Sequence, residues 1–171
     1  MTVVTYFPQR AAENMLHDEF LTAVGLMPGI ASSRPGRSRK LLWVDDSRPM
    51  LALYKAVFEG LGFDVQAICS PQEALDHLSS QATDVAILDY EMPDMDGGVL
   101  ASLIKGLRPE LPVILYSGST CIPQDVHRWV DAICSKAAPL EELLAMINET
   151  LAQPCVLENP ERIRLRAQSL V

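Results

Sequence analysis

Short apolar runs alternate with segments of helical periodicity five times between residues 40 and 152. The runs are brief and rich in Val, Ile, Leu and Ala, as strands buried on both faces of a sheet are. The segments between them carry apolar residues at i, i+3 and i+4, the spacing of an amphipathic helix. This alternation is typical of a parallel sheet covered by helices on both faces. We expect five strands, at residues 40–44, 63–68, 84–88, 112–116 and 132–135.

Local signals mark the expected helix boundaries. The sequence Ser70-Pro71-Gln72-Glu73 combines an N-cap serine, a proline at the first helical position and a glutamate three residues after the cap, which predicts a helix to about Ser80. The first helix is expected from Ser47 to the region of Gly60 or Gly62. Three more are predicted, one after residue 97, a short one at 123–130 and a last one at 139–152.

These elements predict an α/β fold, a doubly wound five-stranded parallel sheet of flavodoxin-like order 2-1-3-4-5. The 171 residues suffice for one compact domain with extensions, which we place at 40–152. Residues 153–171 form a partly basic tail. Residues 1–39 form an N-terminal extension with a linker at 28–38 and one amphipathic helix, which could pack on the domain, pair with another copy or bind a partner. Its apolar face comprises Leu16, Phe20, Ala23, Val24 and Met27.

Charge and composition narrow the range of partners. The net charge is -8, and residues 41–153 alone hold 17 acidic and 6 basic residues, so this domain should repel nucleic acid. The basic cluster at 34–40 is expected to be a solvated linker, with contact to an acidic partner or nucleic acid as the alternative.

The expected location is the cytoplasm. No apolar run approaches the roughly 18 residues of a membrane span, and charged residues interrupt the N-terminus where a signal peptide needs an apolar core. The cysteines lack any metal-ligand spacing, so reduced thiols are predicted at Cys69, Cys121, Cys134 and Cys155.

Polar side chains follow every strand that should border the crevice of this sheet. Asp45 and Asp46 come after the first strand, Asp89 after the third, Ser117 after the fourth and Lys136 after the fifth. Taken singly, each has a simpler interpretation: a helix cap for the aspartate pair, a turn residue for Asp89, a loop residue for Ser117 and a surface lysine. Their convergence on one sheet edge favours a functional site.

The chemistry of this set is specific. Three clustered carboxylates repel one another unless a hard divalent cation offsets them, and Mg²⁺ fits because it binds through carboxylates and keeps waters for phosphate oxygens. With Mg²⁺ and Lys136 the formal charge of the site is zero. A phosphoryl group, whose transfer depends on positioning and charge neutralisation, would meet Asp89 as the nucleophile.

Residues 40–152 resemble the response-regulator receiver domain, the CheY-like phosphoacceptor of bacterial two-component signalling. The resemblance rests on Val44-Asp45-Asp46, on the run Leu88 to Gly97, on Ser117-Gly118 and on Lys136. It implies that Asp89 accepts phosphate from a histidine kinase or phosphotransfer protein. It further implies a Mg²⁺ site made by Asp45, Asp46, Asp89 and the backbone carbonyl of Glu91. Lys136 would pair with the phosphoryl group, and the Ser117 hydroxyl would bond to it and carry the switch.

Two residues depart from the family pattern. The family lysine is usually followed by a proline in a cis peptide, whereas Ala137 follows Lys136 here. The aromatic residue usual three positions before the lysine is Ile133. We therefore expect intact phosphorylation chemistry with unusual signal transmission. The partner face would comprise residues 123–130, 132–135 and 139–152, and near it Trp129 is open to a partner or a core role.

Three functions are compared. The first is a single-domain response regulator that signals through protein contacts and is no enzyme beyond assisting its own phosphorylation and dephosphorylation. The second is a receiver-like scaffold that binds partners without phosphorylation, which the two departures favour. The third is a phosphotransferase or phosphatase with an aspartyl nucleophile. Phosphatases of the haloacid dehalogenase type, however, carry that nucleophile in an Asp-x-Asp after the first strand, where this chain reads Asp45-Asp46-Ser47.

Overall fold

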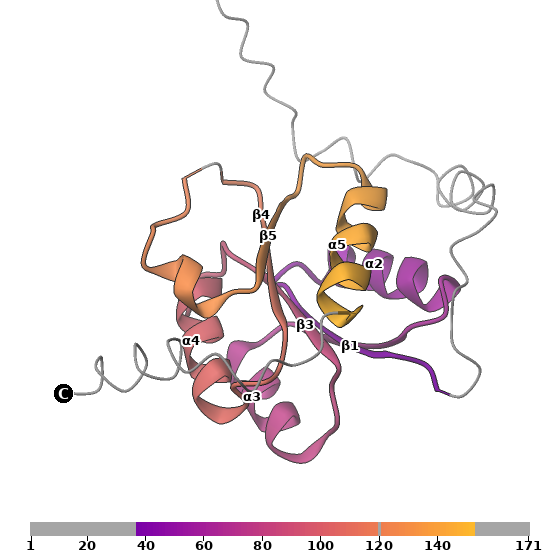
Figure 1. Cartoon of the computed structure of the whole chain (residues 1–171), viewed down its shortest axis with the longest axis horizontal. Coiled ribbons are helices and arrows are strands. Elements are labelled where there is room, and N and C mark those ends of the chain that lie inside the picture. Colours follow the sequence, from indigo (N-terminus) through magenta and orange to yellow (C-terminus); the bar gives the residue numbers. More distant parts are fainter. Residues whose placement is uncertain (1–36, 120, 153–171) are drawn as a thin grey trace, which may run out of the picture.

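A computed structural model describes residues 37–119 and 121–152 (Figure 1). The expectations for the N-terminal helix, most of the linker, the tail and Cys155 lie outside these residues. Helices and strands alternate in the predicted order: β1 Lys40–Val44, α2 Arg48–Gly60, β2 Asp64–Ile68, α3 Pro71–Ser80, β3 Val85–Asp89, α4 Gly97–Leu107, β4 Val113–Ser117, the 3-10 helix η2 Val126–Trp129, β5 Ala132–Ser135 and α5 Leu140–Ala152.

The five strands form one parallel sheet in the order β2-β1-β3-β4-β5, which confirms the predicted topology. In Figure 1, α2 and α5 cover one face of the sheet, and α3 and α4 cover the other. Three strands begin one residue later than predicted, at Asp64, Val85 and Val113. Strands β3 and β4 also end one residue later than predicted, so Asp89 and Ser117 are their last residues. Asp89 pairs with Tyr116, and Ser117 pairs with Ser135.

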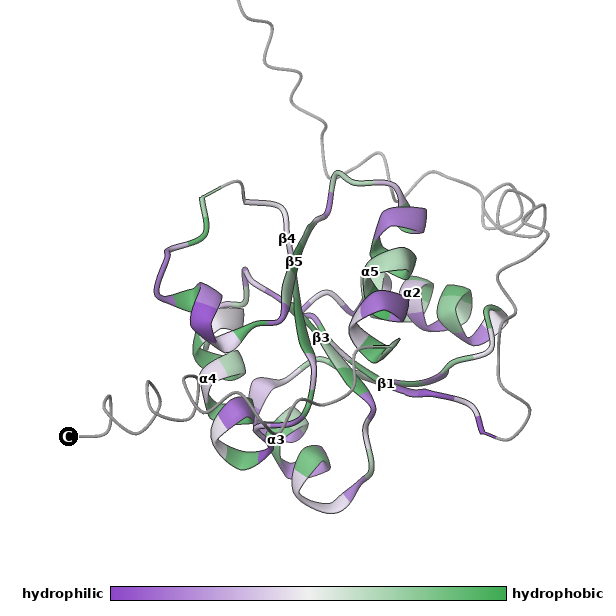
Figure 2. Cartoon of the chain, in the orientation of Figure 1, coloured by the Kyte–Doolittle hydropathy of each residue, from purple (hydrophilic) through white to green (hydrophobic). Residues whose placement is uncertain are grey.

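Alternation along each buried strand divides the core into two clusters, one on each face of the sheet. In β1, Leu41 and Trp43 face α2 and α5, while Leu42 and Val44 face α3 and α4. In Figure 2, the hydrophobic colouring runs along most of the central strands β3 and β4. Strands buried on both faces leave the strand ends as the place for polar side chains.

The predicted helix signals are present in the structure. The Ser70 side chain accepts a hydrogen bond from the Glu73 N–H, and α3 runs from Pro71 to Ser80 as expected. Helix α2 ends at Gly60, and Gly62 has a φ of 91°, a left-handed conformation that glycine adopts without strain. The predicted apolar face of α2 is buried at Leu51, Tyr54, Val57 and Phe58.

The fourth predicted helix is only a 3-10 helix of four residues, η2. Val126 packs against α4 at Gly98, where a Cβ atom would lie 2.7 Å from the Val126 Cγ2 atom. Trp129 is partly buried against the α3/α4 core, and the Arg128 guanidinium lies 5.1 Å from its ring centroid. Trp129 thus contributes to the core without being enclosed by it.

A buried ion pair ties α4 to the starts of β4 and β5. The Lys105 ammonium lies 2.6 Å from the Asp131 carboxylate and 2.6 Å from the Leu111 carbonyl oxygen. The same carboxylate accepts the Val113 N–H at 2.8 Å. The Lys105 side chain is 4% exposed and that of Asp131 28%, so only the carboxylate reaches solvent.

Part of the predicted linker contacts the domain. The Arg37 guanidinium lies 3.9 Å from the Asp84 carboxylate, and Arg39 donates a hydrogen bond of 3.5 Å to Asn148 of α5. Both arginine side chains lie at the amino-terminal edge of the sheet, where Asp84 also accepts the Lys40 N–H at 2.7 Å. Arg37, Arg39 and Asp84 therefore belong to the domain surface.

Candidate functional site

The charged residues of the site continue the alternation of the buried strands. Trp43, Ile87 and Cys134 belong to the core on the α2/α5 face. Two residues further along each strand come Asp45, Asp89 and Lys136, whose side chains therefore start on the same face, beyond the last buried layer. Backbone pairing holds two of these positions, because Asp45 donates to Ile68 at 3.3 Å and Lys136 donates to Ser117 at 2.8 Å.

Three carboxylates meet at this edge of the sheet. One oxygen atom from each of Asp45, Asp46 and Asp89 lies within 4.8 Å of the others. Asp45 and Asp89 are 1% and 3% exposed, whereas Asp46 is exposed. Three converging carboxylate oxygens suit a hard cation such as Mg²⁺, which takes oxygen ligands and retains water. The open side at Asp46 leaves room for those waters.

Lys136 partly neutralises the carboxylates. Its ammonium lies 2.8 Å from the Asp89 carboxylate and 3.3 Å from that of Asp45. Burial works to lower the pKa of Lys136, but the hydrogen bond to Asp89 and the charges of both aspartates outweigh it and raise the pKa. Burial raises the pKa of Asp45, against the opposing charge of Lys136 and the N–H of Ser47. Lys136 is thus held as a cation.

Ser117 and Glu91 are neighbours of the three carboxylates. The Ser117 hydroxyl is buried and accepts the Ser119 N–H at 2.9 Å, so it is bonded within its own loop. The Glu91 N–H donates to the Asp89 carboxylate at 3.2 Å. The Glu91 side chain lies against Gly118, where a Cβ atom would be 3.3 Å from its carboxylate. The predicted metal role of the Glu91 carbonyl stays a prediction.

Gly97 sets the distance between α4 and the site. A Cβ atom at this position would overlap the backbone carbonyl oxygen of Asp89 and lie 2.8 Å from the Leu115 side chain. The Gly97 N–H donates to the Tyr90 carbonyl at 3.0 Å, and the Asp96 side chain caps the helix by accepting the Val99 N–H at 2.9 Å. From the sequence, Gly97 was only a turn residue before a helix.

Three aromatic rings lie beneath the charged groups, an arrangement that sequence reasoning missed. Trp43 stacks on Tyr54, with centroids 4.2 Å apart, and Tyr116 stands edge-on to both rings. The hydroxyl oxygens of Tyr54 and Tyr116 are 3.2 Å apart. Burial raises the pKa of both phenols, so they remain neutral. A tyrosine among aliphatic residues of a buried strand was the signal available in the sequence.

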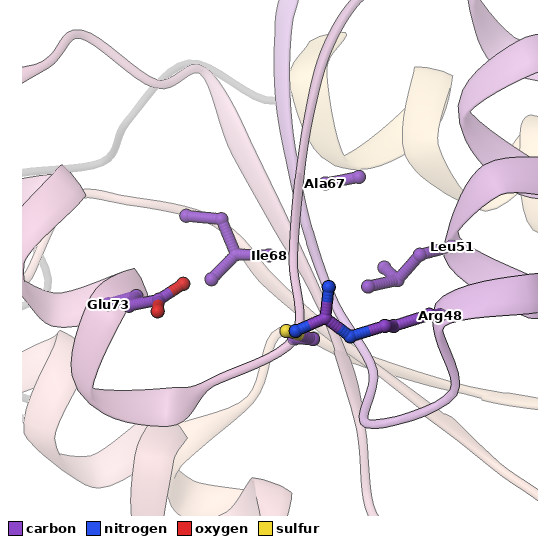
Figure 3. A pocket seen from close by; sticks show the side chains of 6 residues that line it. Arg48, Leu51, Ala67, Ile68 and Glu73 are labelled. Carbon is purple, nitrogen blue, oxygen red and sulfur yellow. The ribbon is translucent and has the colours of Figure 1, made fainter.

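An open hollow of about 460 Å³ lies between α2, the end of β2 and α3 (Figure 3). Arg48 and Leu51 of α2 line one side, and Glu73 of α3 faces them across the end of β2. Ile68 at its floor accepts the backbone hydrogen bond of Asp45. Arg48, two residues after Asp46, therefore lines this hollow.

Comparison with protein families identifies this arrangement. The family model of the response regulator receiver domain matches residues 41–148, which include all the charged residues of the site. The chain belongs to the response regulator receiver domain family. Receiver domains are signalling domains that interact with histidine kinases or phosphotransfer proteins and generally bind Mg²⁺ at an acidic pocket.

Individual relatives agree with this assignment. The C4-dicarboxylate transport transcriptional regulatory protein DctD of Rhizobium meliloti is 39% identical over 84 residues, 49% of this chain and 18% of DctD. The response regulator MprA of Mycobacterium tuberculosis is 26% identical over 136 residues, 78% of this chain and 59% of MprA. The chain thus spans less than two thirds of the length of these curated relatives.

Solved structures show the same receiver fold. A CheY-like receiver domain protein from Methanospirillum hungatei superposes with a TM-score of 0.62 at 26% identity, over 67% of this chain and 94% of that one. The response regulator TrrA of Thermotoga maritima, solved in complex with Mg²⁺-BeF, gives a TM-score of 0.62 at 25% identity over 66% of this chain and 98% of TrrA.

Within residues 37–119 and 121–152, no helix has the length and apolar character needed to cross a membrane.

The two departures from the receiver pattern lie at the end of β5. Ile133 is partly buried against the α3/α4 core. After Lys136, the Ala137 N–H donates to the Ser135 hydroxyl at 3.1 Å and the Ala138 N–H to the Ser135 carbonyl at 3.0 Å. Every peptide bond in the described residues is trans. Ser135 therefore organises the turn that follows Lys136.

Mg²⁺ affinity is expected to fall as the pH is lowered through the folded-state pKa of Asp45, which burial raises, because the cation must then displace the proton from this carboxylate. The stability of the metal-free protein should instead increase as the pH is lowered. A folded-state pKa above the unfolded one means that protonation of Asp45 stabilises the fold fully below the unfolded pKa, and this gain is lost as pH rises through the folded pKa. Calorimetric Mg²⁺ titration and urea unfolding at a series of pH values measure the two trends. An affinity independent of pH would contradict the first.

Proposed function

We propose that this receiver domain accepts a phosphoryl group on Asp89 from a histidine kinase or phosphotransfer protein, in a Mg²⁺-dependent step. The observation that carries the proposal is the Lys136 ammonium, 2.8 Å from Asp89 and 3.3 Å from Asp45, beside a third carboxylate. A cation and a metal-binding carboxylate pair placed around one buried aspartate suit the neutralisation of an incoming phosphoryl group.

Each residue has a defined part in the transfer. An Asp89 carboxylate oxygen forms the new bond to phosphorus while the bond from phosphorus to the donor's histidine nitrogen breaks, and the imidazole retains that electron pair. Lys136 balances charge on the phosphoryl oxygens. Mg²⁺, held by Asp45, Asp46, Asp89 and the Glu91 carbonyl, would supply further positive charge at those oxygens.

Ser117 is proposed as the residue that responds. Its hydroxyl accepts the Ser119 N–H at 2.9 Å in the present state. A phosphoryl group of charge about -1.5 to -2 on Asp89 is a stronger acceptor for the hydroxyl proton, and Ser117 with its loop would shift toward it. The output face proposed for this movement comprises η2, β5 and α5.

The chain is further proposed to act in the cytoplasm through protein contacts, as a phosphoacceptor and not as an enzyme in the usual sense. The acidic surface of residues 41–153 supports protein partners over nucleic acid. The proposed domain limits remain 40–152, with the flanking segments 1–39 and 153–171. Pairing with a second copy through the N-terminal extension stays open.

A second candidate function is a receiver-like scaffold that binds partners without being phosphorylated. Ile133 and Ala137 favour it, because they stand where the family carries its aromatic switch residue and its proline. The complete set of Asp45, Asp46, Asp89, Ser117 and Lys136 favours phosphorylation instead.

Incubation with Mg²⁺ and acetyl phosphate separates the two candidates. We expect the intact mass of the full chain to increase by one phosphoryl group, and the Asp89→Asn variant to show no increase. Asp94→Asn is the matched control, because Asp94 is an exposed carboxylate in the same loop, and it should react as the wild type does. No adduct on the wild type would favour the scaffold, and an adduct that persists in Asp89→Asn would refute Asp89 as the phosphoacceptor.

A further inference from the structure

Tyr116 occupies the position between Asp89 and the strand that carries Lys136. The sheet register pairs Asp89 of β3 with Tyr116 of β4, and Tyr116 with Cys134 of β5. Residues paired in a parallel sheet point to the same face. Lys136 follows Cys134 by two residues and continues that face beyond the end of the ladder, so its side chain passes beside Tyr116 on the way to Asp89.

The geometry of Lys136 agrees with such a path. The ammonium nitrogen lies 5.9 Å from the centroid of the Tyr116 ring, within the range of a cation–π contact, and simultaneously 2.8 Å from the Asp89 carboxylate. Strands β4 and β5 lie side by side at this edge (Figure 1). The negative face of an aromatic ring attracts a cation without competing for its hydrogen bonds.

The Tyr116 ring is itself held in place from below. Its centroid is 5.6 Å from that of Tyr54 and 5.8 Å from that of Trp43, edge-on in both cases. Its hydroxyl is 3.2 Å from the Tyr54 hydroxyl, and the residue is only 5% exposed. By contrast, the Lys136 side chain is 28% exposed.

We propose that Tyr116 is a positioning residue for Lys136, its ring holding the ammonium above Asp89. This inference rests on the proposed function, since it assigns a role in phosphorylation of Asp89. Tyr54 acts one step further away by fixing the Tyr116 ring. The ring contact constrains the Lys136 ammonium at the end of its side chain. The backbone turn at Lys136-Ala137 does not supply this constraint.

The expected kinetic effect is moderate. Loss of a cation–π contact that is partly desolvated should lower the rate of phosphorylation by acetyl phosphate by roughly three- to tenfold. Tyr116→Phe retains the ring and should stay within about twofold of the wild type, because a phenyl face attracts a cation nearly as well. Tyr116→Leu removes the ring and should show the full loss.

A spectroscopic measurement tests the contact without any phosphorylation. The chain contains four lysines, so the ε-methylene protons of Lys136 can be assigned in lysine-labelled full-length protein by their absence in Lys136→Arg. A methylene group over a ring face is shifted upfield. We expect that shift in the wild type and in Tyr116→Phe and its loss in Tyr116→Leu. An unshifted Lys136 resonance in the wild type would overturn the proposal even if Asp89 is phosphorylated.

A fluorinated series at position 116 distinguishes positioning from mere packing. Successive fluorine substitution of phenylalanine weakens the negative ring face with little change in shape. The phosphorylation rate should fall stepwise along the series if the ring holds Lys136, and a constant rate would contradict the proposal. If the wild type accepts no phosphoryl group, the proposed function fails, whereas the resonance shift still decides whether Tyr116 positions Lys136.

Discussion

Asp131→Ala is expected to lower the free energy of unfolding by about 3–5 kcal/mol, the cost typical of removing one partner of a buried ion pair. The variant leaves the Lys105 ammonium, 4% exposed, with the Leu111 carbonyl as its remaining hydrogen-bond partner. It also deprives the Val113 N–H of the carboxylate that accepts it at 2.8 Å. Urea unfolding of the full chain, followed by circular dichroism, measures the loss.

The partner substitution should cost much less. In Lys105→Met the remaining Asp131 carboxylate is 28% exposed and still accepts the Val113 N–H, so water can complete its solvation. A surface pair provides the matched control: Lys55 and Glu59 are 3.0 Å apart on α2 with nearly half of each side chain exposed, and Glu59→Ala should change stability by less than about 0.5 kcal/mol. Equal losses for Asp131→Ala and Glu59→Ala would refute the burial argument.

The topology of the sheet was predictable because its signal is local and repeated. The strands are short, mainly apolar runs, and the segments between them have helical spacing, with a marked start at Ser70-Pro71. Parallel order with crossover helices then leaves few arrangements. Strand boundaries were predicted only to within one residue, because a strand end depends on pairing with the neighbouring strand. The sheet pairs Asp89 with Tyr116 and Ser117 with Ser135.

The charged residues of the site were predictable for a related reason. Parallel strands end at one edge of a sheet, so residues 44 positions apart, such as Asp45 and Asp89, converge once the topology is known. What the sequence could not show was the pairing within the set. Lys136 bonds to two aspartates, while Ser117 bonds to Ser119, and only side-chain coordinates distinguish these arrangements.

Residues that act through tertiary contacts escaped prediction. Lys105 follows the buried residues Ala101 and Ile104 on α4, so helical spacing placed a lysine on the core face, but its partner lies 26 residues away at Asp131. The importance of Gly97 depends on the Asp89 carbonyl, which no local pattern locates. The role inferred for Tyr116 depends on strand register.

The contacts of Asp131 and Ser117 indicate which part of the output region is held in place and which part can move. Asp131 is bonded to Lys105 and, through both its N–H and its carboxylate, to Val113, which anchors the start of β5. At the other end of the connection, the Ser117 hydroxyl is bonded only within its own loop among the described residues. A response that starts at this hydroxyl therefore moves the loop after β4 before it reaches Val126 of η2, which packs against α4, and the Asp131 anchor.

Gly97→Ala is expected to lower both stability and phosphorylation of Asp89. The added methyl group would overlap the Asp89 carbonyl oxygen and lie 2.8 Å from Leu115, so α4 or the end of β3 must shift. Overpacking against backbone typically costs about 1–3 kcal/mol, occasionally more, and this site has no flexible side-chain terminus on the carbonyl side to relieve it. Urea unfolding measures the stability loss, and the acetyl phosphate reaction, run well below the unfolding midpoint, measures the displacement of Asp89.

Gly106 offers a matched control within the same helix. Apart from its chain neighbours and the backbone of its own helix, no atom lies within 4 Å of a Cβ built at Gly106, so Gly106→Ala should raise stability by about 1 kcal/mol through helix propensity alone and leave phosphorylation unchanged. Opposite signs for the two glycines would show that contact with the strand end, and not helix propensity, governs position 97. If Gly97→Ala were as stable and as reactive as the wild type, the strand end would not depend on the close approach of α4. Asp89 would then owe its placement to the sheet alone.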